Sequence, residues 1–419
     1  MIGAKNKLAI LCGGGPAPGM NSVISAVTIE AITRGWDVVG IYDGYSSLIK
    51  GEKNIVPLTI EMVSRIHLDG GSIIRTARAN PTKSEEHLSH VVNTLIEMGI
   101  THLVTIGGDD TAYSASKISE YAKQILGIDF FVVHVPKTID NDLPLPEGLP
   151  TFGFETARAL GAQLVSNLME DAKTTSRWYF AVAMGRTAGH LALGIGKSSS
   201  ATVTIIPEEF MGEEIRLQKI VDILVGSIIK RLASGRNYGV AVIAEGVIEK
   251  IGVEDLQGLD NNCYDEHGHI RYTELDFPNI LKRAVVKNLA DIGLKTTIVS
   301  KEIGYELRCA PPNAFDIEYT RDLGFAAFDY LQNGGTDAMI TIQDNQITPI
   351  PFSEILDSKT KKTQVRKVNI NSIQYQIARK YMIRLEKSDF TEQIDLRKMA
   401  LAVQVDPDKF IKRFEYLLK

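Results

Sequence analysis

The sequence predicts an α/β protein with mostly parallel sheets, and three observations support this fold class. Apolar runs of strand length alternate with segments of helical periodicity, which is the order expected of βαβ units. Glycine-rich or acidic turns follow several of the predicted strands directly, as they do where a strand leads into a helix. With 419 residues, of which 44% are hydrophobic, the chain can bury a sizeable core and form two lobes.

The elements follow one another along the chain in a regular order. Eight apolar, β-rich runs are expected to be strands, at 7–12, 37–42, 101–107, 129–135, 179–184, 201–206, 238–244 and 295–300. Six segments with helical periodicity are expected to be helices, at 85–98, 111–126, 154–172, 214–233, 277–292 and 316–333. A Gly-, Asn- and Asp-rich stretch at 256–269 predicts a surface insertion. The lysine-rich residues 358–367 predict a solvated connection rather than a binding site.

Composition and charge exclude several classes of protein. A net charge of −5 provides no overall attraction to nucleic acid or to an anionic membrane, so we expect neither partner. No segment approaches the ~20 apolar residues that span a bilayer, and the apolar run at 8–11 is too short for a signal-peptide core. Three scattered cysteines, Cys12, Cys263 and Cys309, argue against a disulfide framework and against C-x-x-C zinc sites. They fit a reducing, cytoplasmic location.

Two acidic turns are the most informative feature of the chain. The predicted strand at 101–107 leads into G-G-D-D-T at 107–111, and the strand at 129–135 leads into P-K-T-I-D-N-D at 136–142. Both turns are therefore expected at the carboxyl ends of strands, where ligands bind in open α/β sheets. Together they supply four carboxylates and one lysine, a set that suits phosphoryl transfer with a metal ion.

A third turn joins this group. The strand at 7–12 is followed by Gly13, Gly14 and Gly15, whose backbone could approach a ligand closely and cradle a phosphate. The pattern matches neither G-x-G-x-x-G nor G-x-x-x-x-G-K-[ST]. An ordinary glycine-rich turn between a strand and a helix is therefore an equal alternative.

Seven motifs in this order resemble the 6-phosphofructokinase family over roughly residues 7–345. They are G-G-G-P-A-P-G-M-N at 13–21, G-G-S-I-I-R-T-A-R at 70–78, the two acidic turns, M-G-R from Met184, A-E-G from Ala244 and G-Y-E-L-R from Gly304. A P-x-T-I-D-N-D run after G-G-D is highly specific, whereas related NAD and lipid kinases also have a G-G-D-G-T turn. The resemblance implies two Rossmann-like lobes with the active site in the cleft between them.

The family organisation also implies domain boundaries and partners. The phosphoryl-donor lobe would comprise residues 1–152 and about 306–355, and the sugar-phosphate lobe about 153–305 and 356–419 with its C-terminal extension. The resemblance further implies a cytoplasmic transferase of glycolysis that uses Mg²⁺. We expect a homodimer or homotetramer, because family members place sugar-phosphate residues across subunit contacts.

The aspartates of the acidic turns are the predicted reaction centre. Asp140 is our candidate general base, because a sugar hydroxyl must lose its proton as it attacks phosphorus and the family counterpart has this role. Thr138 and Asp142 are expected to contact the sugar or to orient Asp140 and the metal ion. An Asx-type turn that satisfies its own backbone is the structural alternative. Asp109 is the expected Mg²⁺ ligand, with an N-cap on the helix at 111–126 as its alternative.

Arginines and a few pocket residues complete the predicted site. By resemblance, four positions bind the transferred phosphoryl group or the sugar phosphate: Arg78 with the donor, Arg186 also in catalysis, Arg177 and Arg308. Each arginine alone is most often a solvated surface residue. Whether Arg177 and Arg308 serve their own subunit or a neighbour stays open. Glu245 matches a sugar-hydroxyl acceptor, and three further residues match the sugar pocket, namely Met184, Gly185 and Tyr305.

Two departures from the ATP-using pattern decide the predicted donor. That pattern has G-G-D-G and P-G-T-I-D-N-D, whereas this chain carries Asp110 and Lys137 in place of the two glycines. A carboxylate at 110 would project where the α-phosphate of a nucleotide needs room, and like charges at ~4 Å repel by roughly 4 kcal/mol at an effective dielectric of about 20. Lys137 can instead pair with compact pyrophosphate, although some ATP-dependent relatives also carry this lysine.

The pair resembles the pyrophosphate-dependent phosphofructokinases. The implied reaction is reversible, Mg-dependent phosphoryl transfer from pyrophosphate to the 1-hydroxyl of fructose 6-phosphate, with fructose 1,6-bisphosphate and phosphate as products. An ATP-dependent phosphofructokinase and a non-catalytic regulatory subunit are the alternatives, and the intact acidic turns argue against the second. Ser25 and Ile29 occupy positions where allosteric bacterial enzymes have effector-binding arginines, so we expect little response to ADP or phosphoenolpyruvate.

Overall fold

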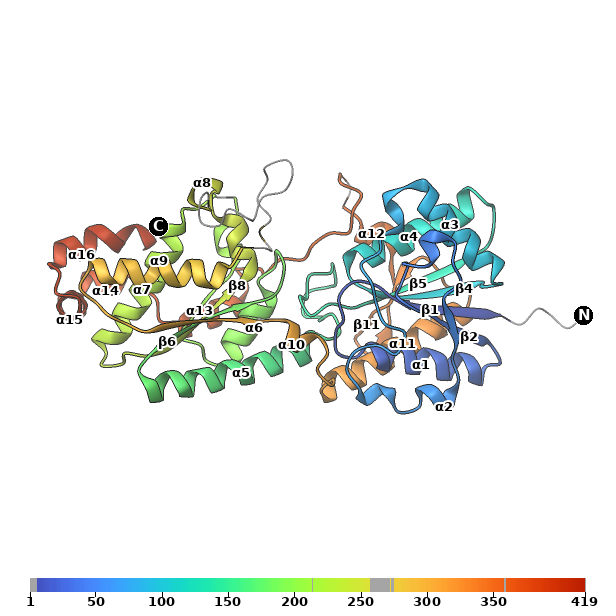
Figure 1. Cartoon of the computed structure of the whole chain (residues 1–419), viewed down its shortest axis with the longest axis horizontal. Helices are drawn as coiled ribbons and strands as arrows, with labels where there is room; N and C mark the ends of the chain where they lie inside the picture. The colour runs from blue at the N-terminus through green and yellow to red at the C-terminus, as the bar shows by residue number, and fades with distance from the viewer. Residues whose placement is uncertain (1–5, 213, 257–271, 273–274, 358, 419) are drawn as a thin grey trace, which may run out of the picture. The chain divides into compact units, whose positions relative to one another are not determined.

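The computed structural model describes residues 6–212, 214–256, 272, 275–357 and 359–418. The chain divides into two compact units, of which unit 1 comprises Met1–Ala157 and Tyr305–Arg366 and unit 2 comprises Arg158–Gly304 and Lys367–Lys419. Each unit has its own mostly parallel sheet with helices packed against it, which confirms the predicted fold class (Figure 1). The donor and sugar-phosphate roles of the two lobes stay predictions. The predicted insertion, from residue 257 onward, lies outside the described residues.

Unit 1 is built on a seven-stranded sheet with the order β13-β10-β5-β4-β1-β2-β3. Its strands are β1 (Lys7–Cys12), β2 (Asp37–Ile41), β3 (Ile55–Pro57), β4 (His102–Gly107), β5 (Phe131–Pro136), β10 (Ala338–Met339) and β13 (Ile350–Pro351). Neighbouring strands are parallel except at the two edges, where β3 and β13 run antiparallel to their neighbours. Because β1, β4 and β5 are parallel neighbours, the turns that follow them emerge at one edge of the sheet.

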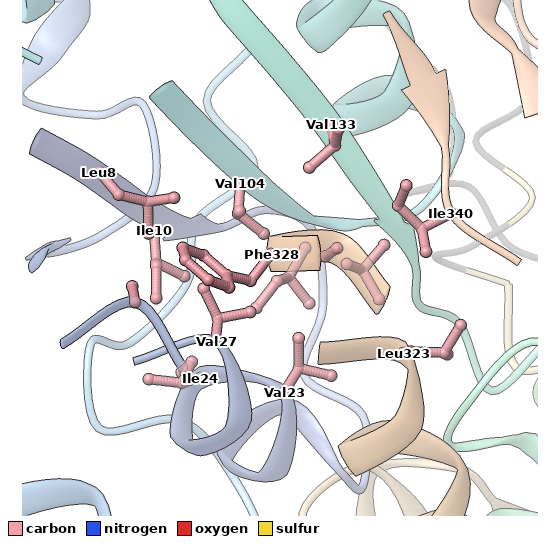
Figure 2. Packing of buried hydrophobic residues seen from close by; sticks show 14 of the residues in the cluster. Leu8, Ile10, Val23, Ile24, Val27, Val104, Val133, Leu323, Phe328 and Ile340 are labelled. Atoms are coloured by element: carbon pink, nitrogen blue, oxygen red, sulfur yellow. The ribbon is translucent and has the colours of Figure 1, made fainter. Parts of the chain in front are cut away.

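Helices cover both faces of this sheet. On one face, α1 (Met20–Thr33) and α11 (Ala314–Gln332) pack on β1, β4 and β5. On the other face lie α3 (Glu85–Glu97) and α4 (Asp109–Gln124). Figure 2 shows the first layer, in which Phe328 of α11 lies among apolar side chains of α1 and of the strands. Burial on both faces explains why the central strands read as continuous apolar runs.

Local signals in the sequence set where these helices begin. Ser84 is the N-cap of α3 and accepts a hydrogen bond from the amide of His87 at 3.1 Å. Asn313 caps α11 in the same way, accepting from the amide of Asp316 at 2.9 Å. Unit 1 also contains five other short elements, α2 (Ile60–Val63), α10 (Tyr305–Arg308), β11 (Ile342–Gln343), β12 (Gln346–Ile347) and α12 (Phe352–Ile355), besides short 3-10 helices.

Unit 2 has a four-stranded parallel sheet with the order β7-β8-β6-β9. The strands are β6 (Trp178–Ala183), β7 (Val203–Ile205), β8 (Gly239–Ala244) and β9 (Ile298–Ile303). The helices are α5 (Phe154–Thr175), α6 (His190–Ser198), α7 (Leu217–Ala233), α8 (Val253–Leu256), α9 (Phe277–Asp291), α13 (Ile373–Tyr381), α14 (Lys387–Thr391), α15 (Gln393–Ala402) and α16 (Pro407–Phe414). The C-terminal helices join this unit through polar contacts such as the 3.2 Å bond from Arg413 to Asp222.

The eight predicted strands and six predicted helices are all present, with small shifts at their ends. The largest shifts are of three residues: the last strand moves from 295–300 to Ile298–Ile303, the helix predicted at 214–233 begins at Leu217, and the helix predicted at 154–172 ends at Thr175. The two-residue strands β10 and β13 escape prediction because they are too short for any periodicity to register. Helix α6 escapes because two glycines interrupt its pattern. Among the residues that the structure describes, no helix is both long and apolar enough to cross a membrane.

Candidate active site

The glycine turn after β1 packs tightly against the first acidic turn. The amide of Gly13 donates to Ile106 O at 2.8 Å, and the amide of Gly14 donates to Ala77 O at 2.9 Å. A Cβ atom at Gly13 would lie only 2.3 Å from Thr111 Oγ1, so this position has no room for a side chain. Two of the three glycine amides are therefore engaged by the protein itself. A phosphate cradle here would depend on Gly15 and on neighbouring side chains.

The first acidic turn leads straight into helix α4. The helix begins at Asp109, and its N-cap is Gly108, which makes no side-chain capping bond. The alternative interpretation of Asp109 as an N-cap is thus wrong, because Asp109 already lies inside the first turn. Asp110, which is exposed, follows it there. Two carboxylates in the first turn are favourable beside the positive end of the helix dipole.

Lys137, in the second acidic turn, is buried and forms hydrogen bonds to both the glycine turn and the first acidic turn. Its side chain is only 4% exposed, and its ammonium donates to Gly15 O at 2.6 Å. Its backbone amide donates to Gly107 O at 2.8 Å. Burial lowers the pKa of Lys137 to about 8, although the negative charge of Asp140 opposes this effect and the cation of Arg308 adds to it. The site thus contains a buried amine that is still protonated at neutral pH.

The second acidic turn buries the side chains that are predicted to be functional. Thr138, Asp140 and Asp142 are 7%, 6% and 4% exposed, respectively. Thr138 Oγ1 accepts from the amide of Asp140 at 3.0 Å, and Asn141 Oδ1 accepts from the amide of Thr151 at 2.9 Å. Thr138 and Asn141 thus supply the kind of turn-stabilising bonds that the structural alternative assigns to an aspartate. The base assignment of Asp140 remains a prediction.

Arg308 lies beside the glycine turn. Its guanidinium carbon is 3.4 Å from the position that a Cβ atom at Gly15 would take, and 5.0 Å from the centre of the Tyr305 ring. The structure therefore groups Arg308 with the predicted donor residues of unit 1, whereas the sequence assigns it to the sugar phosphate. Tyr305 is 76% exposed. Arg78, which is also exposed, directly follows Ala77, the bridging partner of Gly13.

Unit 2 brings a second group of predicted residues together at the carboxyl ends of β6 and β8. Glu245 follows β8, and its Oε1 accepts from the amides of Gly185, at 3.0 Å, and of Arg186. Arg186 has a left-handed backbone with φ 52° and is exposed. The side chain of Met184 packs against Gly304, since its Cε lies 2.8 Å from the position that a Cβ atom at Gly304 would take. One carboxylate therefore holds the backbone of two adjacent residues of the predicted sugar loop.

Arg177 does not join this group. It precedes β6, whereas Met184 and Gly185 follow the same strand, and the six residues of β6 separate the two ends. At about 3.3 Å per residue the strand spans roughly 20 Å. Within unit 2, the structure thus places Arg177 at the opposite edge of the sheet from the loop that contains Arg186.

Several residues of the site carry no clear signal in the sequence. Thr151 donates from its hydroxyl to Thr138 O at 2.7 Å. His134 is fully buried, with Nε2 3.0 Å from Gly107 O and Nδ1 2.9 Å from Thr105 Oγ1. Because a carbonyl oxygen only accepts, Nε2 carries the proton, and burial lowers the pKa of His134 to about 3. Arg366 binds the second acidic turn and lies in the segment expected to be solvated, so that expectation is wrong at this position.

No cluster of three or more His, Cys, Asp or Glu side chains able to hold a metal ion occurs in the described part of the chain. In phosphoryl transfer, proteins commonly bind Mg²⁺ through one or two carboxylates that act together with phosphate oxygens of the substrate. Asp109, at the carboxyl end of β4 and the start of α4, is suitably placed for such a role.

Comparisons with known proteins agree with one another. A family model described as Phosphofructokinase matches residues 7–331. The pyrophosphate–fructose 6-phosphate 1-phosphotransferase of Thermotoga maritima is 53% identical over 414 residues, covering 97% of this chain and 98% of the relative. The protein of the same name from Naegleria fowleri is 49% identical over 422 residues, covering 98% of this chain and 96% of the relative. A solved pyrophosphate-dependent phosphofructokinase from Nitrosospira multiformis, 18% identical, has a TM-score of 0.69 over 90% of each chain and therefore shares the fold.

Proposed function

The chain belongs to the phosphofructokinase family, and from this premise we propose that it is a pyrophosphate-dependent 6-phosphofructokinase. It transfers a phosphoryl group reversibly from pyrophosphate to the 1-hydroxyl of fructose 6-phosphate. Two relatives named for this activity match nearly the whole chain at 53% and 49% identity. Reversibility follows because pyrophosphate and a phosphate ester are close in energy. We therefore propose that the enzyme serves glycolysis and gluconeogenesis in the cytoplasm.

The buried ammonium of Lys137 is the observation that supports pyrophosphate as the donor. The ammonium donates a hydrogen bond to Gly15 O at 2.6 Å and lies near the guanidinium of Arg308. Two cations in a small space suit a compact donor whose charge is concentrated on two phosphates. Asp110 disfavours a longer donor, because its carboxylate would face the α-phosphate of a nucleotide. Since Asp110 is exposed, solvent and salt weaken this repulsion, so we expect discrimination rather than exclusion.

The chemistry follows from the buried aspartate turn. Asp140 takes the proton of the 1-hydroxyl while the hydroxyl oxygen bonds to the nearer phosphorus of pyrophosphate. The bridging P–O bond breaks, and phosphate leaves with the electron pair. Lys137 and Arg308 stabilise the charge on the departing phosphate. When bound, Mg²⁺ neutralises charge on the donor phosphates, and Asp109 is the residue that would hold it.

The sugar phosphate is proposed to bind at the loop that Glu245 shapes. The exposed guanidinium of Arg186 is suited to contact the transferred phosphoryl group, and Met184 with Gly185 lines the sugar pocket. We place Arg177, at the far end of β6, in the sugar-phosphate site of a neighbouring subunit of a homodimer or homotetramer. A mixture of inactive Arg177→Ala and Asp140→Ser chains, refolded together, then regains activity through hybrid oligomers. Light scattering that shows only a monomer would contradict this assignment.

The donor assignment is tested by initial rates with fructose 6-phosphate and Mg²⁺, comparing pyrophosphate with ATP. We expect the wild type to prefer pyrophosphate strongly, and Asp110→Gly to shift kcat/KM toward ATP. Equal or better use of ATP by the wild type would support the alternative, an ATP-dependent phosphofructokinase. Loss of turnover with both donors, combined with binding of fructose 6-phosphate, would indicate a regulatory subunit. The intact set of Asp109, Asp140 and Asp142 argues against that outcome.

A further inference from the structure

Asn141 holds an unusual conformation between the two aspartates of the second acidic turn. Its backbone is left-handed, with φ 57°, which costs a residue other than glycine some energy. Its carbonyl oxygen accepts from Arg366 Nε at 3.1 Å, and its Oδ1 accepts from Arg366 Nη2. The guanidinium of a residue far along the chain therefore stabilises the conformation that sets the direction of Asp140 and Asp142.

The guanidinium of Arg366 also contacts the chain that follows the second acidic turn, at residues 145–149. Arg366 Nη1 lies within hydrogen-bond distance of three carbonyl oxygens, those of Leu145 at 3.3 Å, Pro146 at 3.2 Å and Leu149 at 2.8 Å. The backbone amide of Arg366 donates to Asp142 O at 2.8 Å. A planar group with five N–H donors can bridge several carbonyls at once, and a lysine ammonium lacks this geometry.

Lys367, the next residue, binds a loop of its own unit. Its ammonium donates to the carbonyl oxygen of Thr187 and, at 2.6 Å, to Thr187 Oγ1. Thr187 directly follows Arg186, whose backbone is also left-handed. The amide of Val368 then donates to Glu208 Oε1 at 3.0 Å, and the same oxygen accepts from the amide of Gly189 at 2.9 Å. The segment thus contacts the turn at 187–189 directly at Thr187 and through Glu208 at Gly189.

We infer that residues 366–368 are a positioning segment for two loops, the aspartate turn of unit 1 and the loop at 184–189 of unit 2. Arg366 orients the aspartate turn in unit 1, and Lys367 orients the loop of Met184–Gly189 in unit 2. The segment lies beyond residues 7–331, which the family model matches, so none of the family motifs includes it. The catalytic role of this segment rests on the proposed function, whereas its hydrogen bonds are observed independently of that function.

The two residues are expected to affect different kinetic constants. Loss of the Arg366 bonds misplaces Asp140, and a displacement of about 1 Å at a reacting group can cost ~10²-fold in rate. Its main effect is therefore on kcat. Loss of the Lys367 bonds loosens the loop whose Met184 and Gly185 line the proposed sugar pocket, so its main effect is a higher KM for fructose 6-phosphate. A purely structural role would lower stability without separating the two constants.

The test uses the full-length enzyme with pyrophosphate, Mg²⁺ and fructose 6-phosphate. We expect Arg366→Ala to lower kcat by ~10²-fold, with partial recovery on adding millimolar guanidinium ion. Arg366→Lys should recover little, because an ammonium cannot bridge the carbonyls. Lys367→Met should raise the KM for fructose 6-phosphate and lower kcat much less than Arg366→Ala does. Lys362→Met is the matched control, since Lys362 is exposed in the same segment, and it should behave as wild type.

Two outcomes would overturn the inference. One is a folded Arg366→Ala enzyme with wild-type kcat, and the other is an equal loss of kcat in both variants. If Arg366→Ala fails to fold, Asn141→Gly replaces it, because glycine adopts the left-handed backbone freely. Asn141→Gly should keep most of the kcat if the left-handed backbone at position 141 is what orients Asp140. A complete loss of kcat in this variant would refute that role of the backbone. An inactive wild type would refute the proposed function instead.

Discussion

Lys137 and Gly15 are joined by a 2.6 Å hydrogen bond from a buried ammonium to a backbone carbonyl oxygen. This bond fixes the glycine turn after β1 against the residue that opens the aspartate turn after β5. The amine of Lys137 also lies 3.4 Å from the position that a Cβ atom at Gly14 would occupy. A donor anion that pairs with Lys137 is therefore held next to both turns.

The first prediction concerns the pH dependence of donor binding. Burial lowers the pKa of Lys137 from 10.5 to about 8, so in the donor-free enzyme the ammonium loses its proton as pH rises through about 8. Below that pH the cation is present, and above it the KM for pyrophosphate should rise, by up to tenfold per pH unit. In Lys137→Met this rise should be missing. Pyrophosphate titrates equally with both enzymes, so identical profiles would contradict the prediction.

The second prediction concerns the general base. Asp140→Ser should lower kcat by ~10²- to 10⁴-fold, the range typical of a lost general base, while fructose 6-phosphate still binds. Initial rates and calorimetric titration with fructose 6-phosphate measure the two effects separately. Asp37→Ser, at an exposed position of β2, serves as the control and should keep its activity. Persistent turnover in Asp140→Ser would show that another group accepts the proton.

The third prediction concerns the packing of the glycine turn. In Gly13→Ala the new methyl group would meet Thr111 Oγ1 at 2.3 Å and Thr111 Cγ2 at 2.9 Å. Overpacking of this kind costs about 1–3 kcal/mol of unfolding free energy, and it should also raise the KM for pyrophosphate. Thr111→Ala removes both clashing atoms, so the double variant should recover part of the loss. Strictly additive effects in chemical denaturation would rule out this contact as the cause.

The fourth prediction concerns regulation. Ser25 is buried and donates from Oγ to Val63 O at 2.7 Å, and Ile29 packs against the apolar core of unit 1. Neither position offers a cation to an anionic effector. ADP and phosphoenolpyruvate should therefore change the rate at subsaturating fructose 6-phosphate by much less than the roughly fivefold lower end of ordinary allosteric coupling. Strong activation by either compound in a steady-state assay would contradict this.

Much of the fold follows from the sequence because its elements are long and periodic. The strand from Lys7 to Cys12 is predicted to the residue, since an apolar run between a lysine and a glycine turn has clear ends. The helix at Asp109 begins two residues before its predicted start, because two aspartates without a capping bond give no sharp local signal. The two-residue strands at the sheet edge exist only through pairing with distant strands, which local pattern does not contain.

The candidate site likewise contains residues that the sequence predicts and residues whose grouping only the structure shows. Its sequence motifs indicate Asp109, Asp140 and Lys137, because each follows a strand whose carboxyl end faces the ligand edge of the sheet. Two assignments need the three-dimensional structure. Arg308 lies against Gly15, among the predicted donor residues. Arg177 lies across a whole strand from the loop with which the sequence groups it.

The sequence by itself determined the fold class and the phosphofructokinase motifs. These depend on neighbouring residues, namely apolar periodicity and short turns after strands. Only the tertiary structure decided which groups hold those motifs in place. Arg366 reaches Asn141 across 225 positions of the chain, and Lys367 reaches Thr187 across 180. Contacts at such separations leave no local pattern, because what selects them is the position of carbonyl oxygens in the folded chain.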